Sequence, residues 1–270
     1  MRSQREARGW SQAELARQAN CSESLIAMVE TYQRAPSQSL ARSLDRAFGT
    51  PGFTEDAATG TFTPGTFSRL WSKLRTISLP TRFRPFAERE AEATALRTFE
   101  HSFIPGLLQT ADYARAVVAT KPGATDADIE TDVADRVARQ WILTRDAPPP
   151  PYLWALIDEG ALYRPVAPPL VMHEQFDHLL AMSARPNVSI QVVPYAAGGH
   201  TGLLGAFVMA EVPVAPRIVY VDDISGGRVA EDATDVDKVA LRFETIRSEA
   251  LPTKASRDLI ARVDRERWTA

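Results

Sequence analysis

Apolar side chains recur at helical spacing in the first fifty residues of the chain. Leu40, Leu44 and Phe48 stand four residues apart, and this spacing predicts one buried face of a helix over about 37–48. Gly9 is expected to close an earlier helix, because glycine readily adopts the left-handed conformation that ends helices. Residues 1–50 are therefore predicted to form an all-α domain of four helices, through about residue 8 and over about 11–19, 22–30 and 37–48.

The pattern changes after a Gly-, Thr- and Pro-rich stretch at 51–66, which is predicted to be a linker. Strand-like runs at 152–157 and 188–193 flank a helical pattern at 172–184, an order that predicts two parallel strands joined by a helix. Further strands are predicted at 96–99, 206–210 and 218–221, and further helices at 67–77, at the start of 88–101, and at 109–120, 126–145, 232–250 and 256–268. The chain is thus predicted to be an α+β multidomain protein, with a mixed α/β domain over 67–270.

Charge and composition narrow the class of protein. The chain of 270 residues carries a net charge of −3, but residues 1–50 carry +2 and the remainder −5. A basic N-terminal region followed by an acidic remainder is typical of a nucleic-acid-binding module attached to a domain that does not bind nucleic acid. No apolar run approaches the ~18 residues of a membrane span, no signal peptide opens the chain, and Cys21 is the single cysteine. We expect a cytoplasmic protein without internal disulfides that binds no membrane.

Two helix starts lie close together in the N-terminal domain. Ser11 stands three residues before Glu14, which predicts a capping box in which each side chain accepts a backbone N–H. Ser22 offers a second helix start, and Asn20 and Cys21 form the turn before it. Two short helices joined by so tight a turn are typical of a helix-turn-helix DNA reader.

In such a reader the second helix presents its first turns to base edges, while the helix before it contacts phosphates. Gln12, at the start of the first of these helices, is placed to contact a DNA phosphate. Arg34, just after the second helix, is placed to contact the negatively charged DNA backbone. Glutamate can accept from cytosine N4, serine can pair with several bases, and alanine or methionine can touch a thymine methyl. The alternative is that the serines are only caps and that Arg34 is only solvated. The predicted DNA-contacting residues are Ser11, Gln12, Ser22, Glu23, Ser24, Ala27, Met28 and Arg34.

A longer motif surrounds these helix starts. It consists of residues 5–16, with the sequence REARGWSQAELA, followed by Ser22, Ile26, Glu30, Arg34 and Pro36. This motif resembles the Xre-type, lambda-repressor-like helix-turn-helix family, and the resemblance implies binding to double-stranded DNA. The family turn Glu-x-Gly-x-x-x-Pro has Tyr32 in place of its glycine. Because tyrosine avoids positive φ, this turn is predicted to be built differently.

A second set of motifs runs through the remainder of the chain. It comprises Pro105-Gly106-Leu107-Leu108-Gln109-Thr110 with Tyr113, then Arg139-Gln140, Ile157-Asp158-Glu159, Gln175, 188–194, Phe207 and 219–221. In this order the motifs resemble a large actinobacterial group of regulators described as WhiJ-like or antitoxin-like. The resemblance implies a transcription regulator often encoded beside a small acidic partner protein, in some cases with a toxin–antitoxin logic. It assigns no ligand and no catalytic residue to the C-terminal domain.

Polar side chains of these motifs could line a cleft for a small ligand or for the tail of a partner. The candidates are Gln109, Thr110, Tyr113, Arg139 and Glu159. The alternative is structural: Gln109 and Thr110 cap a helix, and Arg139 pairs with a buried carboxylate. The helices predicted over 232–268 could instead carry the contacts of a homodimer or of a partner.

Motifs for catalysis or metal binding are incomplete. His173 and His178 stand five residues apart, not the four that place zinc ligands on one helix face, so they are interpreted as solvated or paired. The glycine-rich run 198–205 lacks the Gly-Lys-Ser/Thr ending of a phosphate loop, which favours a flexible loop, with a pocket lid as the alternative. The sequence therefore predicts no enzyme activity, no metal and no cofactor.

Two hypotheses of function follow. The favoured one is a dimeric transcription regulator that reads a near-palindromic operator through residues 22–28, and whose C-terminal domain binds a small acidic partner protein or a ligand. The alternative is an antitoxin-like protein that neutralises a small partner by direct binding and autoregulates its own operon.

Overall fold

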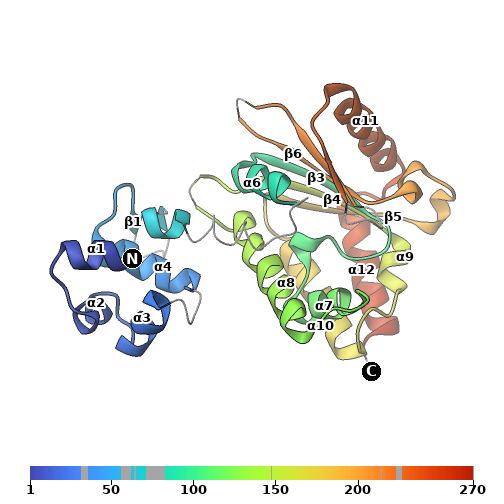
Figure 1. The fold of residues 1–270 in the computed structure, drawn as a ribbon. Helices are drawn as coiled ribbons and strands as arrows, with labels where there is room; N and C mark the ends of the chain where they lie inside the picture. The colour runs from blue at the N-terminus through green and yellow to red at the C-terminus, as the bar shows by residue number, and fades with distance from the viewer. Residues whose placement is uncertain are drawn as a thin grey trace. The chain divides into compact units, whose positions relative to one another are not determined.

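The computed structural model describes residues 1–31, 36–55, 62–63, 65–70, 83–146, 148–213, 215–222 and 227–269. The chain separates into two compact units, here called the N-terminal unit and the α/β unit (Figure 1). The N-terminal unit comprises residues 1–77 and 146–148, and the α/β unit comprises 78–145 and 149–270. Among the described residues, no helix is long and apolar enough to span a bilayer.

Four short helices open the N-terminal unit, close to their predicted positions. They are α1 (Arg2–Ala7), α2 (Gln12–Gln18), α3 (Glu23–Glu30) and α4 (Gln38–Phe48). Their apolar positions are buried as predicted, since Leu15, Ile26 and Leu44 are at most 2% exposed. Gly9 has a φ of 67°, the left-handed conformation predicted for the residue that follows the first helix.

A buried carboxylate joins α4 to the residues that follow the predicted linker. Asp45 is fully buried and accepts hydrogen bonds from the backbone N–H groups of Phe67 (2.7 Å) and Ser68 (2.8 Å). It also accepts from the Thr50 hydroxyl at 2.6 Å. The two N–H groups lie in the first turn of a helix, where a negative charge is stabilised.

The N-terminal unit therefore extends beyond the predicted domain boundary at residue 66. The stretch predicted as a linker contains a short antiparallel pair of strands, β1 (Thr54–Glu55) and β2 (Phe62–Thr63). Phe67, predicted to open the α/β domain, stacks on Phe48 with ring centroids 5.1 Å apart. Glycine, threonine and proline are frequent in tight turns as well as in linkers, so composition alone does not separate a hairpin from a linker.

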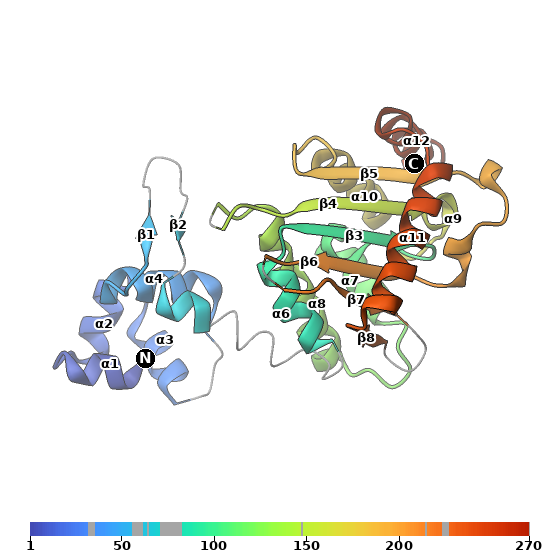
Figure 2. The same ribbon diagram turned by 90° about the horizontal axis from the view of Figure 1, so that it is seen from above.

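A six-stranded mixed sheet forms the centre of the α/β unit, in the order β5-β4-β3-β6-β7-β8 (Figure 2). Neighbours among β3, β4 and β5 are parallel, and every other neighbouring pair is antiparallel. The predicted parallel pair joined by a helix is confirmed by β4, α10 (Pro169–Met182) and β5. The strands are β3 (Ala95–Glu100), β4 (Tyr152–Asp158), β5 (Val188–Val193), β6 (Phe207–Glu211), β7 (Ile218–Val221) and β8 (Arg228–Ala230).

Helices cover both faces of this sheet (Figure 1). Because successive strand residues point to opposite faces, the sheet contributes to two cores. In one core Ile190 packs with Phe176 and Ile260, and in the other Phe207 packs with Phe243. The helix α11 (Ala233–Glu249) covers the second face. The remaining helices of the unit are α6 (Arg84–Glu92), α7 (Ala111–Val118), α8 (Asp126–Arg139), α9 (Glu159–Tyr163) and α12 (Thr253–Arg267), with single 3-10 turns at Gly106–Leu108, Gln140–Leu143, Tyr195–Ala197 and Thr201–Leu204.

Candidate DNA interface and fastened loop

Serine caps open both helices of the predicted DNA reader. The Ser11 hydroxyl oxygen accepts the N–H of Glu14 (3.0 Å), and the Ser22 hydroxyl oxygen accepts the N–H of Leu25 (3.2 Å). Between the two helices Asn20 has a φ of 52°, a conformation that asparagine tolerates better than most residues. The chain can therefore begin α3 only a few residues after α2 ends.

Only one of the two bonds of the predicted capping box forms at the start of α2: Ser11 accepts a backbone N–H, but the prediction for Glu14 is wrong. The Glu14 carboxylate pairs with Arg17 and accepts from the Gln18 amide (3.1 Å), so it does not return to the backbone of the N-cap. A complete capping box occurs instead at the start of α8, where Thr125 and Asp128 each accept a backbone N–H of the other. A nearby cation competes with the backbone for the carboxylate, and the spacing of the motif does not reveal this competition.

The N-terminal turn of α3 offers the polar surface that a DNA reader needs. Ile26, in the middle of the helix, is fully buried, which fixes the side that faces the core. The predicted base-contacting positions stay accessible in different degrees: Ser22, Glu23 and Ser24 are exposed, and Ala27 and Met28 are half-buried.

A buried ion pair holds the two helices of the reader to α1. The Arg5 guanidinium donates twice to the Glu30 carboxylate, at 2.8 and 2.9 Å, and once to the Trp10 carbonyl at 2.8 Å. The Gln12 amide donates to the same carboxylate at 2.8 Å. The Arg5 hydrogen bond holds the pKa of Glu30 below its ordinary value, and Glu30 raises the pKa of Arg5. The start of α2 is thus fixed relative to the end of α3.

Gln12 therefore uses its amide N–H inside the unit, while the helix start that carries it still presents backbone N–H groups for an anion. Ser11 caps that same start. The prediction for Arg34 falls outside the described residues, as does Tyr32. Arg5 and Glu30 were not predicted as site residues, although both stand in the motif that carries the helix-turn-helix resemblance.

Glutamines fasten the loop that follows β3, residues 104–110, here called the fastened loop. Gln109 donates to the Ile104 carbonyl (2.6 Å) inside the loop. Gln140 donates to the Gln109 carbonyl (2.6 Å), and Gln175 accepts the N–H of Thr110 (2.7 Å). Gln109 and Gln175 are at most 2% exposed. These side chains satisfy backbone groups that would otherwise be buried without partners.

Thr110 and Tyr113 also serve this loop. The Thr110 hydroxyl oxygen caps α7 by accepting the N–H of Tyr113 (3.3 Å). The Tyr113 ring is fully buried, and its hydroxyl oxygen accepts the N–H of Ile104 (3.2 Å). Burial raises the pKa of Tyr113 to about 12. Three of the five predicted cleft residues therefore lie together and shape the end of one loop.

The other two predicted cleft residues have separate partners. Arg139 donates two hydrogen bonds to the buried carboxylate of Glu90, at 2.7 and 2.8 Å. This is the structural alternative predicted for Arg139, pairing with a buried carboxylate. Glu159, at the start of α9, accepts the N–H of Tyr195 at 2.7 Å. The contacts of these residues do not join them to the fastened loop. Gln140 and Gln175, which the predictions missed, do belong to it.

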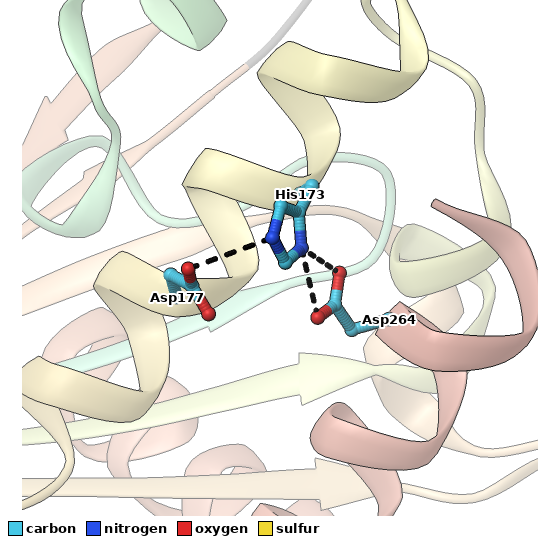
Figure 3. A group of neighbouring side chains, drawn as sticks. All are labelled: His173, Asp177 and Asp264. Atoms are coloured by element: carbon cyan, nitrogen blue, oxygen red, sulfur yellow. Dashed lines mark hydrogen bonds and ion pairs between the residues drawn. The ribbon is translucent and has the colours of Figure 1, made fainter. Parts of the chain in front are cut away.

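The histidine region of α10 forms an ion pair between helices (Figure 3). The His173 Nδ1 lies 2.9 and 3.0 Å from the two carboxylate oxygens of Asp264 on α12, and the Nε2 lies 3.7 Å from the Asp177 carboxylate. These ligand-type atoms lie within 4.8 Å of one another. Because the two carboxylates contact different ring nitrogens, one metal ion could not bind the ring and both carboxylates in this arrangement.

We expect the stability of the α/β unit to depend on the protonation of His173. Asp264 raises the pKa of His173, so the ion pair stabilises the fold at pH values below the ordinary histidine pKa of 6.5. This contribution is lost as the pH rises through the higher pKa of the folded state. After correction for intrinsic exchange rates, the protection of the α12 amides should therefore fall between pH 6 and 8 in the wild-type chain but not in His173→Gln. Equal pH profiles of the wild type and His173→Gln would contradict this role.

Comparison with protein-family models gives two matches. A model described as a domain of unknown function (DUF5753) matches residues 83–262, about two thirds of the chain. The chain belongs to the DUF5753 family. A helix-turn-helix model matches residues 1–52. Comparisons with curated proteins and with solved structures find no match.

The two matches bear on different units of the chain. The helix-turn-helix match covers α1–α4 and supports a DNA-binding transcription regulator of the Xre-like type, as predicted. The DUF5753 match runs from the residue before α6 into α12, and its description assigns no activity. The narrower resemblance to WhiJ-like regulators stays a prediction.

Proposed function

We propose that this protein is a sequence-specific transcription regulator that binds its operator as a homodimer, and that its DUF5753 domain adjusts DNA affinity in response to a ligand or a small partner protein. The supporting observation is the first turn of α3, which exposes Ser22, Glu23 and Ser24. A buried network of Arg5, Glu30 and Gln12 holds this helix in place. A rigid helix with a polar first turn is what base readout in the major groove requires.

A gel-shift titration of the full chain on the DNA upstream of its own gene tests the DNA-binding role. Each phosphate contact should add about 0.9 to the slope of log affinity against log salt concentration. A second copy on the other half-site should give a complex of two chains per operator, which sedimentation measures. Binding that is absent or insensitive to salt would overturn the proposal.

Base readout by α3 predicts a loss that is specific to the operator. Glu23→Ala and Ser24→Ala should each weaken operator binding by about 1–2 kcal/mol and leave binding to random DNA nearly unchanged. Gln4→Ala is the matched control, because Gln4 is also exposed but lies on α1. Equal losses on operator and random DNA would assign these two side chains to non-specific contacts instead.

The antitoxin-like role is the second candidate, favoured by exposed leucines on the α/β unit. Leu203 and Leu204 are 53% and 76% exposed in the 3-10 turn beside α11, and Leu241 on α11 is 71% exposed. Apolar surface of this kind suits a protein partner. Co-purification with the product of the adjacent gene, and rescue of growth when that product is toxic, would favour this role. In both versions the protein has no catalytic role.

A further inference from the structure

The exposed side of α12 carries mostly positive charge. The helix lies beside β5 at the border of the sheet and also packs on α10 and α9 (Figure 2). Its buried residues are Ser256, Leu259, Ile260, Val263 and Asp264. Four cations of the helix are exposed and are here called the basic face: Lys254, Arg257, Arg262 and Arg265. Only two of its carboxylates, Asp258 and Glu266, are exposed, although the chain after residue 50 carries −5.

Helix geometry places the basic face away from the core. Because successive residues of a helix are rotated by about 100°, Lys254 and Arg265 lie opposite the buried side, with Arg257 and Arg262 on its two flanks. None of the four forms an ion pair with a residue that the structure describes. On α11, by contrast, Lys238 pairs with Asp235 and Arg247 pairs with Glu244. The cations of the basic face are therefore available to another molecule.

The chemistry of the basic face fits a polyanion better than a protein surface or a membrane. Among the described residues, the large apolar side chains that are exposed lie on other elements, and none lies on α12. The centre of a protein interface is apolar, and a helix that lies on a membrane needs an apolar side as well. Binding to a nucleic-acid backbone needs only cations that replace its counterions.

The length of the basic face suits the backbone of a DNA duplex. Lys254 and Arg265 are separated by about 16 Å along the helix, at about 1.5 Å per residue. A duplex carries one negative charge per ~1.7 Å of its axis, so several phosphates fall within that length. Three of the four cations are arginines, whose planar guanidinium groups can donate two hydrogen bonds to one phosphate.

We propose that the basic face of α12 binds the DNA backbone beside the operator, without regard to base sequence. The helix-turn-helix of the same chain holds the DNA, so the second contact is intramolecular and strengthens binding through a high effective concentration. The proposal rests on the DNA-binding role of the N-terminal unit. It adds a DNA contact in the DUF5753 domain, to which the family description assigns no activity.

The test compares two duplexes that share one operator, whose ends are first mapped by footprinting. The short duplex ends at the operator, and the long one continues into flanking DNA of arbitrary sequence. The full wild-type chain should bind the long duplex more tightly. Arg262→Gln/Arg265→Gln should lose this gain, about 10-fold at low salt, and lower the slope of log affinity against log salt by about 2 per chain. Glutamine forms helices as readily as arginine, so the melting temperature should not change.

Lys238→Gln/Arg247→Gln is the matched control. It removes the same number of charges from exposed positions of α11, where both cations already have partners. This variant should bind both duplexes as the wild type does. Equal losses in the two double variants would trace the effect to net charge alone and overturn the assignment to α12.

The proposal is also overturned if the wild type and Arg262→Gln/Arg265→Gln bind the long duplex equally. A variant that keeps its affinity for the long duplex but no longer retains an acidic protein bound to the wild type would assign the basic face to that protein instead. Failure of the wild type to bind the short duplex would overturn the proposed function. The comparison of wild type and variant on the long duplex would still decide the role of the basic face.

Discussion

Replacing Glu30 with alanine is expected to lower the free energy of unfolding of the N-terminal unit by about 3 kcal/mol. The substitution leaves the Arg5 guanidinium, whose side chain is only 11% exposed, without its two charge-assisted hydrogen bonds. It also leaves the Gln12 amide without its acceptor. Since these bonds link α1, α2 and α3, the loss should appear as faster amide hydrogen exchange in α2 and α3 of the full chain.

Arg17→Ala is the matched control for this prediction. Arg17 also pairs with a carboxylate, that of Glu14, but its side chain is 74% exposed, so its removal should change stability by less than about 0.5 kcal/mol. Operator binding should weaken with Glu30→Ala, because α2 and α3 lose their fixed relative placement. Equal exchange rates in Glu30→Ala and the control would show that the buried pair contributes nothing.

The same ion pair makes the stability of the N-terminal unit depend on pH in the acid range. Arg5 lowers the pKa of Glu30 below 4.5, its ordinary value, so the stabilisation is complete above that pH. It is lost as the pH falls through the lower pKa of the folded state. The difference in exchange between the wild type and Glu30→Ala should therefore shrink in acid.

Local patterns along the chain were enough to predict most of the secondary structure. The strands β5 and β7 have the predicted bounds, and α4 follows from the spacing of Leu40, Leu44 and Phe48. The serine caps at Ser11 and Ser22 could also be predicted, because a cap bonds a backbone group three residues away.

Contacts between distant segments could not be predicted in this way. Asp45 binds the N–H groups of Phe67 and Ser68, which places those residues in the N-terminal unit, yet nothing in the local sequence of either segment names the other. The same holds for Gln175, which accepts the N–H of Thr110. A buried polar side chain near a predicted helix indicates that a partner exists, and only the fold supplies that partner.

The end of β3 illustrates this limit. Its last residue, Glu100, lies just outside the strand predicted at 96–99 and was not predicted as a site residue. Burial raises the pKa of Glu100, Asp222 adds to this effect and Arg136 opposes it, and both residues lie far away in the sequence. The family motifs do mark the fastened loop that follows β3, through Gln109 and Gln140.

Glu100→Gln is expected to stabilise the α/β unit by about 3 kcal/mol at pH 8. In the wild type the folded state favours the protonated carboxyl, since the pKa of Glu100 is about 8 in the fold against an ordinary 4.5. Folding therefore becomes less favourable as the pH rises from 4.5 to about 8 and changes no further above it. Glutamine has nearly the same shape and no charge, so the variant avoids this penalty.

Hydrogen exchange of the β3 and β4 amides in the full chain measures the difference. Near pH 4.5 the wild type and Glu100→Gln should be equally stable, because Glu100 is then protonated in the folded chain and the penalty is absent. Glu92→Gln, at an exposed site, should match the wild type at every pH. A variant that is less stable than the wild type at pH 8 would mean that the Glu100 carboxylate has a stabilising partner.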